Sequence, residues 1–269
     1  MDRKFILGIA VAVVIVFFAV ACVNYVQKNT VPAKDRDTLY QVSTINALMM
    51  GSFDGTEPVS EVLRHGDFGI GTYDGLDGEM IVLDGTMFQA KSDGLIYPVN
   101  STVTTPLATV TWFDNDFSTT TGSRVNMSEM TTDLAARLPS QNLIYGVKMH
   151  GTFPSVKIRA IPRQQPPYPT LTEASKSQGV HTLSNTTGTV IGFYMPVFFE
   201  GLNVPGYHFH YISDDKKTGG HVLDLVVDAG TPVTYDITSG FAMTLPTSGT
   251  FTNIDLSQNL SADLAKVEK

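Results

Sequence analysis

The sequence predicts an α+β fold of two closely packed, mostly antiparallel β-rich halves with a few helices, preceded by an N-terminal hydrophobic segment. Many short segments of the 269-residue chain are rich in β-branched and aromatic residues and are separated by Gly, Asp and Asn. Only two segments show a helical pattern. A stretch with four prolines at 162–169 divides the β-rich body. Proline disrupts regular structure, so we expect an extended connector there and place a candidate seam between the halves near 161–170.

The composition excludes several classes of protein. The hydrophobic fraction of 42% and the charged fraction of 16% are typical of a globular chain. A net charge of -8 argues against a nucleic-acid partner, because phosphate binding needs clustered Lys and Arg. Cys22 is the single cysteine, so an internal disulfide and a multi-thiolate metal site are both excluded. Any metal site must therefore use His and carboxylates.

Residues 1–25 are predicted to be a signal peptide, a lipoprotein signal or a membrane anchor. Arg3 and Lys4 precede an uncharged apolar run at 5–23. As a helix this run would measure roughly 28 Å, close to the hydrocarbon thickness of a bilayer. The sequence Ala-Val-Ala-Cys that ends at Cys22 also resembles a bacterial lipobox, so lipidation of this cysteine and an uncleaved anchor both stay open.

The charge at the N-terminus predicts where the body lies. Positive residues before an apolar segment favour retention of that end in the cytoplasm, which places the remainder outside. We therefore expect an extracytoplasmic protein tethered to the membrane by an anchor or by lipidated Cys22. Residues 26–37 are polar and suit a linker, and 38–269 would form the body.

Helices are expected at 44–50 and from near Ser128 to Leu138, where Ser128 is the expected N-cap. Asp84-Gly85 between two apolar runs predicts a hairpin turn. Strands are expected at 80–83, 87–90, 110–113, 144–150, 155–160, 189–199, 207–213 and 221–227.

The stretch from Tyr207 to Leu225 predicts a metal site. His208 and His210 are two residues apart, so on a strand both side chains leave the same face. A turn centred between residues 215 and 216 would place His221 opposite His210 on that face. Three imidazoles with a vacancy are the ligand set of a catalytic zinc ion. His65, His150 and His181 lack such a geometry, and we expect them to be structural.

Several motifs in order resemble the bacterial alpha-acetolactate decarboxylases. They are Leu-Tyr-Gln at 39–41, Ile-Asn-Ala-Leu at 45–48, Gly-Ile-Gly-Thr at 69–72, Leu-Asp-Gly-Glu-Met-Ile-Val-Leu-Asp-Gly at 76–85 and Tyr-His-Phe-His-Tyr at 207–211. The resemblance extends from Leu39 to the C-terminus. It implies a carbon–carbon lyase (a carboxy-lyase) that converts 2-acetolactate to acetoin and CO2 in acetoin (butanediol) biosynthesis, and a homodimer.

The resemblance also implies roles for individual residues. Zinc would be held by His208, His210 and His221. Glu79, Arg159 and Glu268 would be catalytic. Thr72 would face the substrate, and Arg159 would also bind it.

The chemistry expected of this set starts from the substrate, whose ketone and hydroxyl oxygens can both bind one zinc ion. Decarboxylation would then pass through a zinc-stabilised enediolate. Arg159 would orient the carboxylate, and the two glutamates would act as acid or base groups near the metal, with neither singled out as the proton donor.

Two other functions stay open from the residues. A cupin-like metal oxygenase also uses two histidines on a strand and a later one, but a Glu usually follows the second histidine, where this chain has Ile-Ser-Asp-Asp at 212–215. A non-catalytic surface lipoprotein would not need three converging imidazoles. Oxygen uptake would identify the first, and a metal-free purified protein would favour the second.

Overall fold

The computed structural model describes residues 35–268, and the chain from Arg36 onward forms one compact unit. The predicted signal or anchor at 1–25, Cys22 and most of the predicted linker at 26–37 lie outside the described residues. Among the helices of the described part, none combines the length and the apolar character needed to span a bilayer.

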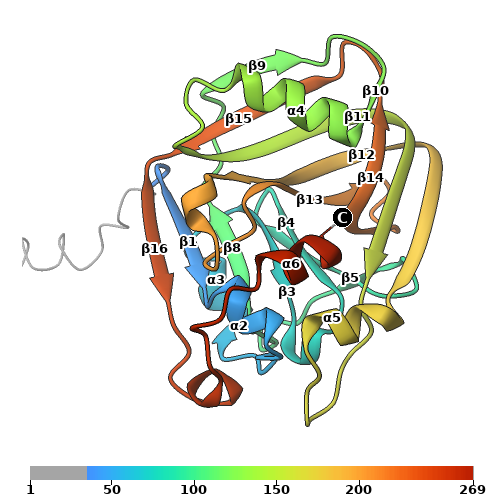
Figure 1. Cartoon of the computed structure of the whole chain (residues 1–269). Coiled ribbons are helices and arrows are strands. Elements are labelled where there is room, and N and C mark those ends of the chain that lie inside the picture. The colour runs from blue at the N-terminus through green and yellow to red at the C-terminus, as the bar shows by residue number, and fades with distance from the viewer. Residues whose placement is uncertain (1–34, 269) are drawn as a thin grey trace, which may run out of the picture. The chain divides into compact units, whose positions relative to one another are not determined.

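The first of two seven-stranded sheets is built largely from the N-terminal half of the described chain (Figure 1). Neighbouring strands are antiparallel, except that the edge strand β16 runs parallel to β1. In spatial order the strands are β16 (Gly240–Thr244), β1 (Thr38–Val42), β8 (Ala108–Thr111), β3 (Phe68–Thr72), β4 (Glu79–Leu83), β5 (Thr86–Ala90) and β6 (Ile96–Pro98). A separate pair joins β2 (Glu57–Pro58) to β7 (Thr104–Thr105).

The second sheet is antiparallel and curls on itself, because β14 pairs with β11 as well as with β13. In spatial order its strands are β10 (Val125–Asn126), β14 (Gly219–Val227), β13 (Gly206–Ser213), β12 (Gly179–Met195), β11 (Ile144–Ala160), β15 (Pro232–Thr238) and β9 (Phe117–Thr120). The long strands β11 and β12 form a hairpin that carries most of this sheet.

The chain crosses between the sheets twice, once between β8 and β9 and once between β15 and β16. The proline-rich segment at 161–170, our candidate seam, instead connects β11 to α5 (Leu171–Ala174), after which β12 returns to the same sheet as β11. The two sheets therefore divide the chain at 112–116 and near residue 239.

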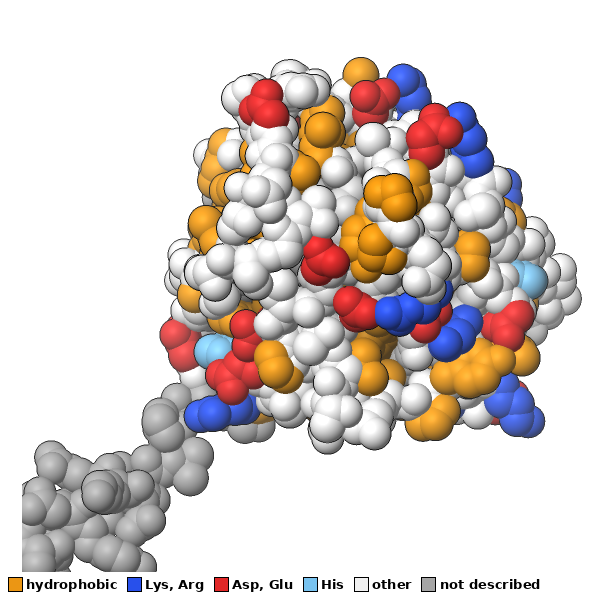
Figure 2. Space-filling model, turned by 90° about the horizontal axis from the view of Figure 1, so that it is seen from below, with side chains coloured by type: hydrophobic (Ala, Val, Ile, Leu, Met, Phe, Trp, Pro, Cys, Tyr) orange, Lys and Arg blue, Asp and Glu red, His pale blue; other side chains and the backbone are white. Residues whose placement is uncertain are grey.

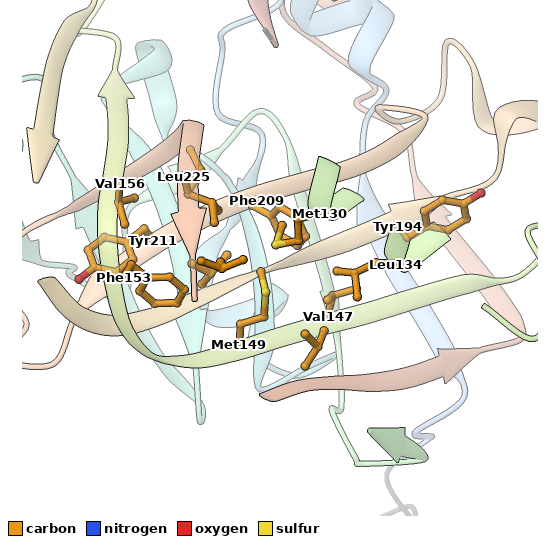
Figure 3. Close-up of a cluster of buried hydrophobic side chains, with 14 of the residues drawn as sticks. Met130, Leu134, Val147, Met149, Phe153, Val156, Tyr194, Phe209, Tyr211 and Leu225 are labelled. Atoms are coloured by element: carbon orange, nitrogen blue, oxygen red, sulfur yellow. The ribbon is translucent and has the colours of Figure 1, made fainter. Parts of the chain in front are cut away.

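Apolar side chains from both sheets meet in one core layer, in which Ile70 and Ile81 of the first sheet join Phe193 and Ile212 of the second. A second cluster fills the curled sheet beneath the helix α4 (Met127–Arg137), whose Met130 and Leu134 point into it (Figure 3). The fold class of two packed, mostly antiparallel halves is thus confirmed.

Three of the remaining helices pack together near the interface between the sheets. The helices α2 (Ile45–Met49), α5 and α6 (Ser261–Val267) share an apolar cluster that includes Leu48, Leu171 and Leu264. The short helix α3 (Val59–Val62) packs on the other face of the first sheet. On the face in Figure 2, acidic and basic side chains of the described residues are interspersed.

Several sequence predictions need correction. The predicted strand at 189–199 ends at Met195, because Pro196 follows and a 3-10 turn, η3 (Val197–Phe199), replaces the strand. The predicted strands at 144–150 and 155–160 are one strand, β11. The N-cap of α4 is Asn126, not Ser128, and Asn126 forms a capping box with Glu129.

Other predictions are confirmed. The helix expected at 44–50 is α2, which begins at Ile45 because Thr44 is its N-cap and accepts a hydrogen bond from the backbone N–H of Ala47. Asp84 and Gly85, at φ 51° and 75°, form the two-residue turn between β4 and β5.

Candidate active site

The three predicted histidines converge at the interface between the two sheets. His208 and His210 project from β13 and His221 from β14. One ring nitrogen of each lies within 4.8 Å of one from each of the others. The side chains of His210 and His221 are 1% and 2% exposed and that of His208 is 14% exposed, so solvent reaches the group only at His208. The predicted convergence is confirmed, and the group could hold a metal ion.

The hairpin between β13 and β14 sets this geometry. His210 pairs directly with His221, which is the register predicted from the turn. Lys216 sits at the turn with φ 57°, a left-handed conformation that reverses the chain. Ser213 fixes the loop further, since its hydroxyl donates to Asp215 and accepts from the backbone of Thr218.

The first sheet orients one of the rings. His210 Nδ1 lies 2.8 Å from the carbonyl oxygen of Met80 in β4, so Nδ1 donates to that oxygen and Nε2 keeps its lone pair. His208 Nε2 lies 3.0 Å from His221 Nδ1. His221 Nε2 is buried and has no hydrogen-bond partner among the described residues, as expected of a nitrogen that awaits a ligand.

All three rings are electrically suited to a cation. Burial lowers the pKa of His208 to about 3, with the positive charge of Arg159 as the second cause. Burial is also the largest cause that holds the pKa values of His210 and His221 well below the usual range. The rings are therefore neutral at physiological pH, which is the form that binds metals.

Arg159 and Glu79 form a buried ion pair beside the histidines. Arg159 lies opposite His221 on the neighbouring strand β11, and its Nη1 donates to Glu79 Oε1 at 2.8 Å. Glu79 belongs to the other sheet, at the start of β4, and its Oε2 lies 3.7 Å from His210 Nε2. The two side chains are 5% and 10% exposed. Burial raises the pKa of Glu79 to about 7, an effect that Arg159 opposes and Glu268 adds to.

Glu268 approaches from the residues that follow α6. Its Oε2 lies 3.6 Å from His208 Nε2 and 3.8 Å from His221 Nε2, and its Oε1 lies 3.7 Å from Arg159 Nη2. Burial raises the pKa of Glu268, and Arg159 opposes that rise. Packing of α6 against α5 and α2 holds this carboxylate over the histidines.

Thr72 lines the same cavity from the first sheet. It pairs with Glu79 across β3 and β4 and is buried. Its hydroxyl donates to the carbonyl oxygen of Gly78 at 2.6 Å. Because the Thr72 hydroxyl hydrogen is used in this bond, the hydroxyl oxygen of Thr72 can only accept a hydrogen bond from a bound molecule. All seven residues singled out from the sequence thus line one cavity.

The apolar wall of this cavity was not predicted from the sequence. It is formed by Ile45, Leu48, Leu76, Leu107 and Leu171. The spacing of Ile45 and Leu48 on α2 was a signal that they share a helix face. Leu107 and Leu171 come from segments distant in the sequence.

The histidines expected to be structural lie elsewhere. His65 stacks on Tyr40 with ring centroids 3.8 Å apart, His150 contacts Asp214, and His181 lies 3.0 Å from the carbonyl oxygen of Ser92. None of these three histidines is part of the cavity that contains His208, His210 and His221.

Comparison with known proteins points to one family. The family model described as alpha-acetolactate decarboxylase matches residues 39–258. A protein of that name from Methanosarcina mazei is 52% identical over 233 residues, which cover 87% of this chain and 81% of that protein. The Bacillus subtilis protein of that name is 36% identical over 218 residues, covering 81% of this chain and 85% of its own.

Solved structures agree with the sequence comparison. The crystal structure of alpha-acetolactate decarboxylase from Bacillus subtilis superposes with a TM-score of 0.83 at 34% identity and covers 86% of this chain and 99% of its own. A Staphylococcus aureus protein described as similar to that enzyme gives a TM-score of 0.80 at 30% identity, covering 86% and 100% of the two chains.

Proposed function

Because this chain belongs to the alpha-acetolactate decarboxylase family, we propose that it converts 2-acetolactate to acetoin and CO2 with a zinc ion held by His208, His210 and His221. The observation that carries the proposal is the convergence of three buried, neutral imidazoles with the ion pair of Glu79 and Arg159. As a member of this family, the protein is a carboxy-lyase.

The residues fit a divalent metal. Three neutral nitrogen donors leave room for further ligands on the metal. The buried Nε2 of His221 has no hydrogen-bond partner among the described residues, so it can bind a metal ion. Bound metal supplies a Lewis acid that stabilises the negative charge developing on the substrate oxygens as CO2 leaves. Imidazole nitrogens suit zinc and also copper, nickel or iron, whereas calcium and magnesium prefer oxygen ligands.

Arg159 binds and orients the substrate carboxylate. Its Nε is buried and has no hydrogen-bond partner among the described residues, so a donor is free to meet an anion. A guanidinium offers two parallel donors to a carboxylate, which fixes the direction of the bond that breaks.

Glu79 and Glu268 handle the proton. A pKa near 7 allows the carboxyl of Glu79 to hold a proton at neutral pH and to release it to a developing carbanion. Glu268 Oε1 lies 3.7 Å from Arg159 Nη2, which supports a part for Glu268 in the same transfer. Thr72 can accept a hydrogen bond from the substrate hydroxyl, and the apolar wall would face the methyl groups of 2-acetolactate.

The two other functions are not favoured. Both the sequence and the fold match the decarboxylase family over most of the chain. The cavity also presents two carboxylates and an arginine, a polar set that a binding protein without chemistry would have no reason to bury.

The test of the function is acetoin production from racemic 2-acetolactate by a chain that begins at Val26, with zinc content measured on the same sample. We expect about one zinc per chain and acetoin in the parent, and neither in His210→Ala. Metal without acetoin would support an oxygenase, which an oxygen electrode would detect. A protein without metal or acetoin would indicate a binding role.

We also propose the location and assembly expected from the sequence: a body outside the cytoplasm, tethered through residues 1–25, that forms a homodimer. Deletion of residues 1–25 should move the protein from the membrane fraction to the soluble fraction without loss of turnover. Light scattering on that shortened chain should give twice the chain mass. Membrane association that survives the deletion would contradict the tether.

A further inference from the structure

A second group of carboxylates lies where the chain crosses between the sheets. Asp114 and Asp116 belong to the segment between β8 and β9, and Asp236 lies in β15, shortly before the chain returns to the first sheet as β16. One oxygen of each lies within 4.8 Å of one oxygen of each of the others. Oxygen ligands lie about 2.3–2.6 Å from a calcium ion, so this separation fits a shared ion.

Asp236 is the member of the group that requires a partner. The residue is 0% exposed, and neither carboxylate oxygen has a hydrogen-bond partner among the described residues. Burial of a carboxylate without donors is strongly unfavourable, so the group must gain either a proton or a cation. Burial is the largest cause, followed by the neighbouring carboxylate of Asp114, that raises the pKa of Asp236 to about 8.

The backbone fixes Asp116 beside Asp236. Its N–H donates to the carbonyl oxygen of Tyr235 at 3.0 Å, and its Oδ2 accepts from the N–H of Ile237 at 2.7 Å. Asp116 is thus hydrogen-bonded to the two residues of β15 that flank Asp236. Its other oxygen stays available to an ion.

A glycine packs directly against the buried carboxylate. Gly146 pairs with Asp236 across β11 and β15. A Cβ atom at this position would lie 3.4 Å from Asp236 Oδ2 and 3.2 Å from the ring of Phe113. A Cβ at these distances would crowd both side chains, so the glycine lets β11 pass close beside the carboxylate.

The nearby cations do not neutralise Asp236. Arg36 Nη1 lies 3.7 Å from Asp114 Oδ2 and donates to the carbonyl oxygen of Phe113, and its side chain is 47% exposed. Lys148 Nζ lies 4.5 Å from the centre of the Phe113 ring. Neither cation makes a hydrogen bond to Asp236.

We propose that Asp114, Asp116 and Asp236 bind a calcium ion, which ties together the two segments that cross between the sheets. The donors are all carboxylate oxygens, which suit a hard cation, whereas the imidazole set suits zinc. Asp116 is exposed, so water can complete the coordination from that side. The site is separate from the proposed reaction, so its failure and that of the proposed function are distinguishable.

Terbium is a suitable probe, because it takes the same oxygen ligands as calcium and emits when a nearby aromatic ring is excited. Trp112 is the single tryptophan and lies two residues before Asp114. Terbium added to the full-length, zinc-loaded protein in detergent should give emission through this ring. Calcium should compete with that emission and should raise the thermal unfolding midpoint.

Two variants and a control decide the result. Asp236→Asn and Asp114→Asn should each weaken terbium binding at least tenfold and remove the calcium-dependent rise in the midpoint, while acetoin production persists. Asp84→Asn removes the same charge from an exposed turn and should behave like the parent. The half-exposed Asp114 keeps the test valid if Asp236→Asn does not fold.

The opposite results would overturn the site. Emission retained in both variants would place terbium elsewhere on the acidic surface. A parent midpoint that calcium does not change, together with an Asp236→Asn midpoint equal to or above it, would show that Asp114 and Asp236 share a proton instead.

Discussion

His210 and His221 stand directly opposite each other on β13 and β14, with ring centroids 5.5 Å apart. His208 lies one side-chain repeat along β13 on the same face. All three histidines of the candidate metal site come from one hairpin, which the turn at Lys216 holds in register.

Replacement of His210 by alanine should remove the metal and the activity together. The ring supplies a nitrogen donor and the hydrogen bond to Met80, and both are lost. Loss of a residue that only hydrogen-bonds a metal ligand typically lowers metal affinity or activity roughly 10–100-fold. Because His210 would itself be a ligand, we expect kcat/KM to fall by more than that. Metal analysis and acetoin formation measure both effects. His150→Ala, which changes an exposed histidine, is the control and should retain full zinc.

Replacement of Arg159 by lysine should lower kcat/KM about 10- to 100-fold, although the charge is kept. A lysine cannot hold Glu79 and a substrate carboxylate with separate planar donors, and a hydrogen bond to a charged group contributes about 1.5–3 kcal/mol. Steady-state kinetics measure the loss. Arg137→Lys alters an exposed ion pair on α4 and should stay within about twofold of the parent. Equal losses in both variants would argue against a role for Arg159 in the site.

The stability of the metal-free protein should carry a pH dependence due to Glu79. A glutamate carboxyl in the unfolded chain has a pKa of 4.5, and burial raises the pKa of Glu79 in the folded protein to about 7. Between these values the folded chain keeps a proton that the unfolded chain has lost, so the contribution of Glu79 to stability declines as pH rises and is gone above about 7. Glutamine at this position has no such dependence.

Urea unfolding of the metal-free parent and of Glu79→Gln over this pH window tests that expectation. The free energy of unfolding of the variant, minus that of the parent, should increase with pH and then level off. Asp236 contributes equally to both proteins and cancels in the difference. A difference that stays constant with pH would show that Glu79 titrates normally in the folded protein.

Replacement of Glu268 by glutamine should reduce kcat more than it changes KM, because an uncharged amide still fills the space but cannot exchange a proton. Its contacts with Arg159 and His208 make a loss of about tenfold or more reasonable for an acid–base group. Asp263→Asn, on the exposed side of α6, is the matched control. A variant with unchanged kcat would remove Glu268 from the proton-handling set.

The parts of the site that were predictable from the residues are those with local causes. Alternation along one strand and the centre of one turn place His208, His210 and His221 together. Glu79 and Arg159 are 80 residues apart and come from different sheets. No local pattern connects them, so their pairing could be expected only from the resemblance to a family.

The fold shows the same limit. The hairpin at Asp84-Gly85 and the helix capped by Thr44 follow from short-range rules. The continuity of β11 does not, because Pro154 reads as a strand break. The ladder passes over Pro154, and the opposite residue Asn185 adopts φ 48°, so the missing N–H is accommodated without ending the strand.

The origin of the site residues in two sheets has a mechanical consequence. The second sheet alone contains the three imidazoles and Arg159, whereas Glu79 and Thr72 belong to the first. If one sheet shifted along the other by a single residue, about 3.3 Å, the three imidazoles would stay together. The 2.8 Å hydrogen bond between Arg159 and Glu79 would break, because the shift is longer than the bond itself. Buried side chains such as Ile81 and Ile212 do not line the cavity, but their packing between the sheets keeps Glu79 and Arg159 aligned.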